Sequence, residues 1–168
     1  AAYLRSEGWT DEEEERLFEL HNTHGNRWAR ISHFLPGKYH INGFRTDNCI
    51  KNHFYCTLRK AFRRINRYIT ENKLKTKSRE IKNVILSKII SVAEQRFETK
   101  LDVSPEMIEV CFKIKNDLVK YSKDRPIDEA AEPHVLELIN NINEFSHSFK
   151  KRKVKKPEKP VTIEEPIV

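Results

Sequence analysis

The feature that most constrains the fold is an apolar stripe that recurs every three or four residues in the middle of the chain. Its members are Ile50, Phe54, Leu58, Phe62, Ile65 and Ile69. This spacing fits the 3.6-residue period of an α-helix and not the two-residue period of a strand. It therefore predicts a helix that begins near Asp47 and continues past Tyr68.

Two shorter helices are expected ahead of this one. Thr10 is a good N-cap for the segment DEEEERLFELHNTH, and the acidic first turn is explained by the favourable helix dipole. Gly25 supplies a stop for this helix. A second helix is expected from about 27 to 34, and Pro36-Gly37 ends it.

Three more helices are expected later in the chain, at about 78–99, 105–122 and 133–149. Ser104-Pro105 is a clean helix start, with Ser as the cap and Pro at the first position. A two-stranded wing around Asn42-Gly43 and an irregular loop are equally compatible with the sequence there. With only 4 Gly and 7 Pro in 168 residues, the chain is predicted to be all-α.

The net charge of +7 is unevenly distributed. Residues 45–82 hold 12 Lys or Arg against 3 Asp or Glu, and residues 150–160 hold 7 against 1. Two basic blocks on an otherwise acidic chain indicate a polyanionic partner, with nucleic acid favoured over a membrane surface. Lys and Arg on ordinary solvated helix faces are the alternative.

Other classes of function are disfavoured. No apolar run approaches the ~20 residues that cross a bilayer. The three cysteines, Cys49, Cys56 and Cys111, form no C-x-x-C pair, so we expect no metal site or disulfide framework. The chain has no Gly-rich phosphate loop, no H-E-x-x-H motif and no nucleophile at motif spacing from a base. We therefore expect no enzymatic activity, no cofactor and no small-molecule substrate.

One segment is more specific than these general patterns. Residues 9–60, WTDEEEERLFELHNTHGNRWARISHFLPG…RTDNCIKNHFYCTLRK, resemble a Myb repeat, most closely the last repeat of multi-repeat Myb proteins. That family has three regularly spaced aromatic residues, one in each helix. Trp9 and Trp28 are 19 residues apart, and Trp28 and Phe54 become 19 apart when the seven inserted residues 38–44 are removed.

The resemblance implies a three-helix, homeodomain-like helix-turn-helix domain over residues 9–73, with an extended third helix. The aromatic residues are expected to hold the fold, since so small a domain buries little else. His21 matches a buried His of the family, so we expect it to pack rather than to bind metal. The expected core residues are Trp9, Leu17, His21, Trp28, Ile31, Ile50 and Phe54.

The third helix is the expected recognition helix. In the family, the residues matching Asn48, Lys51 and Asn52 approach the major groove, where Lys can donate to guanine and Asn can bond bidentately to adenine. Tyr55 and Cys56 share that face, and they differ from the Asn and Ser of animal Mybs, which leaves the base preference open. The expected phosphate contacts are Lys38, Arg45, Arg59, Lys60, Arg63 and Arg64.

The resemblance implies sequence-specific binding of double-stranded DNA in the major groove by a nuclear transcription regulator. The alternative is the SANT branch of the same fold, which binds histone tails or protein partners, or a DNA-targeting subunit of a larger nuclear complex. SANT third helices tend to be acidic or bulky at the DNA face. The third helix here is basic and retains Lys51-Asn52, which favours DNA.

Three segments flank the Myb-like domain. Residues 1–8 resemble the linker that follows an earlier repeat. Residues 74–149 carry apolar stripes that fit either a small helical bundle or a surface for a protein partner or homodimer. Residues 150–168 are expected to be a basic, Pro-rich disordered tail. Its run KKRKVKK resembles the nuclear localisation signal of viral large T antigen, and its basic residues are Lys150, Lys151, Arg152, Lys153, Lys155 and Lys156. An additional electrostatic contact with DNA is the alternative, and the two roles are compatible.

Overall fold

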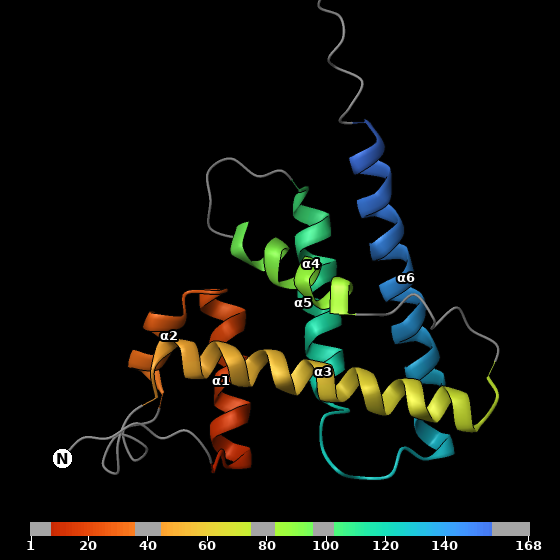
Figure 1. Ribbon diagram of the computed structural model, residues 1–168, viewed down its shortest axis with the longest axis horizontal. Coiled ribbons are helices and arrows are strands. Elements are labelled where there is room, and N and C mark those ends of the chain that lie inside the picture. Colours follow the sequence, from red (N-terminus) through yellow and green to blue (C-terminus); the bar gives the residue numbers. More distant parts are fainter. Residues whose placement is uncertain (1–7, 36–44, 75–82, 96–102, 156–168) are drawn as a thin grey trace, which may run out of the picture.

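The computed structural model describes residues 8–35, 45–74, 83–95 and 103–155 (Figure 1). Its elements are α1 (Asp11–His24), α2 (Trp28–Phe34), α3 (Asp47–Glu71), α4 (Asn83–Glu94), α5 (Pro105–Val119), the short 3-10 helix η4 (Glu129–Ala131) and α6 (Glu132–Lys155). No strand occurs within these ranges, and the predicted all-α fold is confirmed. The wing considered around Asn42-Gly43 and the phosphate contact expected from Lys38 lie outside the described residues.

The helices begin and end at local sequence signals. Thr10 Oγ1 accepts a hydrogen bond from Glu13 N at 3.0 Å, as predicted for the start of α1. Ser104 Oγ accepts from Met107 N at 3.2 Å, with proline in the first turn of α5. At the end of α1, Gly25 adopts φ 60° and donates its N–H to His21 O at 2.8 Å. A left-handed φ of this kind favours glycine, which explains the stop.

α3 is 25 residues long, which corresponds to about 37 Å of continuous helix. It lies across the front of α1 and α5 in Figure 1. The six residues of its apolar stripe are all at most 6% exposed. α3 therefore packs against α1 and α2 on the N-terminal side of the chain and against α4 and α5 on the C-terminal side.

α1, α2 and α3 enclose an aromatic core. Leu17, His21, Ile31, Ile50 and Phe54 are each at most 1% exposed. The Phe54 ring lies 4.3 Å from the His21 ring and 5.1 Å from the Trp28 ring. Trp9 and Trp28 are only partly buried and pack against the edge of this core.

The C-terminal helices complete the same core instead of forming a separate bundle. α5 packs against α3 as well as α4 and α6, and the Phe112 ring lies 5.4 Å from the His21 ring. Lys115 of α5 is 1% exposed. Its ammonium group donates to Phe18 O at 3.4 Å and to Asn22 Oδ1, at the last turns of α1. The predicted apolar stripes of residues 74–149 are thus largely used within the chain.

α6 continues to Lys155, past the predicted end at 149. Its backbone therefore includes the first six residues of the basic run, while Lys156 and the rest of the tail lie outside the described residues. No helix in the described ranges is long and apolar enough to cross a membrane.

Candidate nucleic-acid interface

The N-terminal half of α3 presents a polar face to solvent. Asn48, Asn52 and Cys56 are exposed, and Lys51 and Tyr55 are half-buried beside them. From residue 48 to residue 56 the helix rises by about 12 Å. The major groove of B-DNA admits one α-helix, so this face can enter the groove.

Tyr55 is held by neighbours on two sides. Its hydroxyl lies 2.8 Å from Ser87 Oγ of α4, and the Arg59 guanidinium lies 5.1 Å from the centre of its ring. Arg59 Nη2 also donates to Cys56 Sγ at 3.3 Å. These contacts link Tyr55, Cys56 and Arg59 to one another and Tyr55 to α4.

The basic residues of α3 fall into two groups. Arg63 is exposed and Arg59 half-buried on the same face as Asn52. In contrast, Lys60 Nζ pairs with Asp124 at 3.2 Å, and Arg64 Nη1 donates to Tyr121 O at 2.7 Å. Lys60 and Arg64 are thus both engaged with the α5–α6 connection. The contacts of Arg64 argue against its predicted role as a phosphate contact. Lys60 is 43% exposed and its partner Asp124 is 85% exposed, so the phosphate role of Lys60 stays a prediction.

Arg67 is a further basic residue that the sequence analysis did not select. It is exposed and follows Arg59 and Arg63 at four-residue spacing, which places the three on one face of the helix. The repeat of Arg at every fourth position was a signal present in the sequence.

Arg45 is buried and bound within the protein. It is 2% exposed, and its guanidinium binds both carboxylate oxygens of Glu13, with Nη2 to Oε1 at 2.9 Å. It also stacks 4.0 Å from the centre of the Trp9 ring. The backbone carbonyl of Arg45 accepts a hydrogen bond from Ser32 Oγ at 2.8 Å. These contacts argue against the predicted phosphate role and assign Arg45 to fixing the start of α3 on α1 and α2.

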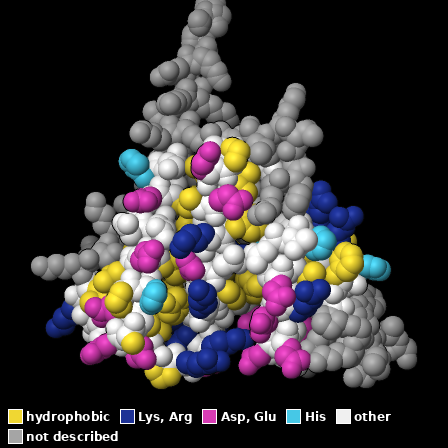
Figure 2. Space-filling model, turned by 180° about the vertical axis from the view of Figure 1, so that it is seen from behind, with side chains coloured by type: hydrophobic (Ala, Val, Ile, Leu, Met, Phe, Trp, Pro, Cys, Tyr) yellow, Lys and Arg dark blue, Asp and Glu magenta, His cyan; other side chains and the backbone are white. Residues whose placement is uncertain are grey.

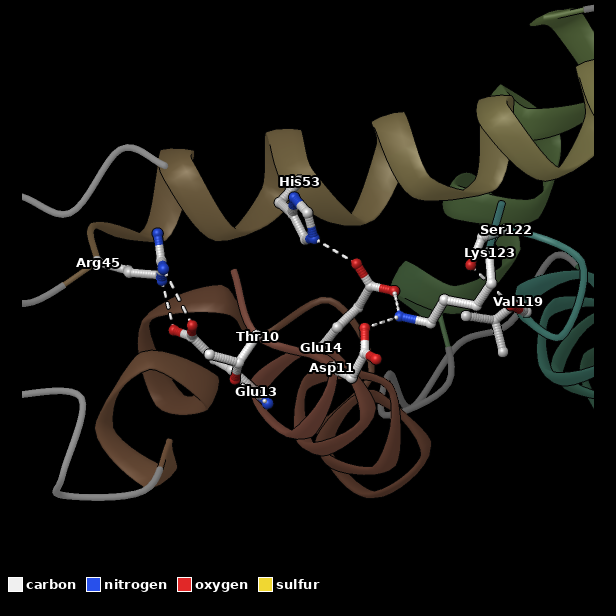
Figure 3. A network of polar contacts seen from close by, with 9 residues as sticks. All are labelled: Thr10, Asp11, Glu13, Glu14, Arg45, His53, Val119, Ser122 and Lys123. Atoms are coloured by element: carbon white, nitrogen blue, oxygen red, sulfur yellow. Dashed lines mark hydrogen bonds and ion pairs between the residues drawn. The ribbon is translucent and has the colours of Figure 1, made fainter. Parts of the chain in front are cut away.

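A second polar network joins α1, α3 and the segment that follows α5 (Figure 3). Glu14 lies 2.8 Å from His53 Nε2 and 2.8 Å from Lys123 Nζ, which also binds Asp11 at 2.8 Å. Burial alone would raise the pKa of Glu14, but the hydrogen bonds from His53 and Lys123 outweigh it and lower the pKa to about 2. The His53 ring stacks on Trp9 at 4.1 Å. This network links α1 to α3 and to the segment that follows α5.

The opposite face of the molecule differs from α3. Figure 2 shows Lys and Arg side chains interspersed with Asp and Glu over the described part of that face. Mixed charge of this kind is typical of an ordinary solvated surface. Within the residues that the structure describes, no group of three or more His, Cys, Asp or Glu side chains is arranged to hold a metal ion.

Three packed helices, the last with an exposed polar and basic face, define a helix-turn-helix unit. Residues 6–58 match the family model of the Myb-like DNA-binding domain. The resemblance predicted from the sequence is therefore confirmed over this segment.

Individual relatives match the same part of the chain. It is 42% identical over 57 residues to Myb-related protein B of Gallus gallus and 44% identical over 57 residues to Myb-related protein A of Homo sapiens. It is also 44% identical over 57 residues to transcription factor MYB3R-4 of Arabidopsis thaliana. The matched residues make up 34% of this chain but only 7%, 7% and 5% of those three relatives. No solved structure gave a significant match.

Proposed function

We propose that the chain binds double-stranded DNA sequence-specifically, with the N-terminal half of α3 in the major groove, and that it regulates transcription in the nucleus. The observation that carries this proposal is the shared exposed face of Asn48, Asn52 and Cys56 on the helix that the Myb-like match includes. An exposed Asn amide can bond bidentately to adenine, and Lys51 can donate to guanine.

The length of α3 gives the exposed arginines a separate role. Arg63 lies 11 residues after Asn52, or about 16 Å further along the helix axis. In homeodomain-like domains the C-terminal end of the recognition helix contacts the backbone, so Arg63 and Arg67 would lie over the sugar-phosphate backbone. Contacts of this kind fix position and carry no sequence information.

The experiment compares variants of the full chain on a duplex site chosen by selection from random duplexes. Asn52→Ala should remove most of the preference for the selected site over a scrambled duplex, because each bidentate contact discriminates by ~1–3 kcal/mol. Arg63→Ala should weaken binding to both duplexes equally and reduce the salt dependence. The matched control is Asn140→Ala on an exposed turn of α6. A preference unchanged by Asn52→Ala would contradict the proposal.

The alternative is protein interaction of the SANT type. The observation in its favour is that Arg45, Lys60 and Arg64 are engaged within the chain, which reduces the basic surface near α3. Titration with histone-tail peptides separates the two functions. Peptide binding without measurable affinity for any duplex would support the alternative.

A nuclear location is supported by the basic run that begins at Lys150. Residues 150–155 belong to the backbone of α6, so the run continues a helix in the structure. Ending a fluorescent fusion at residue 149 should lower its nuclear accumulation. Unchanged accumulation would show that this run is not the signal.

A further inference from the structure

α4 borders the face of α3 that we propose to enter the groove. The contact is the 2.8 Å hydrogen bond between Ser87 Oγ and the Tyr55 hydroxyl. In Figure 1, α4 lies above α3 and crosses α5. Any ligand that reaches Tyr55 therefore comes close to the solvent face of α4.

α4 is held firmly at this position. Leu86, Ile89, Val92 and Ala93 are each at most 1% exposed and belong to the shared core. The Cys111 thiol of α5 donates to Ile89 O at 3.2 Å. Moving α4 away would return these apolar side chains to water, which is unfavourable. DNA must therefore bind with α4 in place.

The size of the groove then decides where α4 lies relative to the duplex. A helix with its side chains is about 10–12 Å across and the major groove is about 12 Å wide, so α3 alone fills it. The neighbouring α4 can lie only at the edge of the groove, where the phosphates are. Ser87 and Ser91, one turn apart, are exposed on its solvent face. Serine hydroxyls are common donors to phosphate oxygens.

We propose that Ser87 and Ser91 make a second contact with the DNA backbone, on the phosphates that border the groove occupied by α3. This inference rests on the proposed function of α3 and names a further part of the chain that binds the same duplex. Glu94 is also exposed on α4, about 10 Å beyond Ser87 but only about 4.5 Å beyond Ser91 along the helix axis. Ser87 is therefore the contact farther from this negative charge.

The test places a negative charge at each serine of the full chain. Ser87→Asp and Ser91→Asp should each weaken affinity for the selected duplex about tenfold, because a carboxylate would lie close to phosphate. The matched control is Ser148→Asp on α6, where the serine is exposed and its hydroxyl donates to Glu144 O at 3.1 Å. That variant should stay within about twofold of wild type, since it adds the same charge far from α3. Circular dichroism and melting temperature confirm that each variant is folded.

Each other outcome overturns the inference. If only Ser87→Asp weakens binding, the effect comes from Tyr55 and not from phosphates. If both variants bind more tightly, α4 obstructs the groove. If neither changes the affinity while Asn52→Ala still removes sequence preference, α3 contacts DNA without α4 and the proposed function stands. If the wild-type chain has no affinity for duplex DNA, the proposed function fails as well.

Discussion

The buried ion pair between Arg45 and Glu13 gives the sharpest prediction about stability. The two side chains are 1% and 0% exposed, and the pair joins the residue before the cap of α3 to the first turn of α1. Glu13→Gln keeps the shape of the side chain but leaves the Arg45 charge buried without its counter-charge. Removing one partner of a buried pair costs about 3–5 kcal/mol. We expect about 3 kcal/mol, since the amide oxygen still accepts one hydrogen bond.

Urea unfolding and thermal melting measure this effect directly. In a chain of this size each kcal/mol shifts the melting temperature by about 2–4 °C, so a decrease of about 6–12 °C is expected. The matched control is Glu19→Gln, which breaks the exposed 3.4 Å pair with Arg16. Exposed pairs contribute less than about 1 kcal/mol. Equal stability of the two variants would refute the structural role of Glu13.

Substitution of Arg45 distinguishes a structural role of this residue from a DNA-contacting role. Arg45→Met should lower the free energy of unfolding but leave the salt dependence of DNA binding unchanged. A phosphate-contacting arginine would instead lower the salt slope by about one. A reduced slope with wild-type stability would restore the prediction made from the sequence.

Three further predictions follow from the polar contacts. The pKa of Glu14 is lowered from 4.5 to about 2 in the folded chain, so its contribution to stability is present above about pH 4.5 and is lost as the pH falls toward 2. The melting temperature of Glu14→Gln should therefore change less between pH 4.5 and pH 2 than that of the wild-type chain. Lys115→Ala should lower the free energy of unfolding in urea by about 2 kcal/mol, because it removes the hydrogen bonds to Phe18 O and Asn22 Oδ1 and leaves a cavity between α5 and α1; no change would mean that α5 and α1 are not coupled there. Arg64→Ala should lower stability without changing the salt slope of DNA binding, whereas Arg67→Ala should reduce that slope by about one and leave stability unchanged.

Local features of the fold could be predicted from the sequence because they depend on neighbouring residues. The caps at Thr10 and Ser104 and the stop at Gly25 are each defined within about one helical turn, and the long apolar stripe of α3 depends only on spacing within one helix. The 19-residue spacing of the aromatic residues is also recognisable once the seven inserted residues 38–44 are removed. These signals were sufficient for the all-α fold and for the Myb-like segment.

Long-range contacts could not be predicted in the same way. The acidic first turn of α1 has a sufficient local explanation in the helix dipole. In the structure, however, Glu13 and Glu14 also bind Arg45, His53 and Lys123, partners 32, 39 and 109 residues away. Periodicity reports which face of a helix is polar, but it does not report which partner that face meets. Arg45 and Arg64 were therefore predicted to contact phosphates from their positive charge, although both are bound within the chain.

One of these contacts had a signal in the sequence. Lys115 lies between Cys111 and Leu118 at the spacing of the apolar stripe of α5. A lysine in such a stripe is expected either at an end of the helix or against an acceptor on another element. Its burial against α1 shows that the C-terminal helices and the Myb-like segment share one core.

Recognition of a particular duplex sequence by α3 can be measured by selection from random duplexes followed by titration of the full chain. We expect one enriched sequence, bound at least about tenfold more tightly than a scrambled duplex, as one or two specific base contacts would give. We also expect that affinity for both duplexes falls as salt rises. No enriched sequence, together with affinity independent of salt, would show that α3 does not recognise DNA.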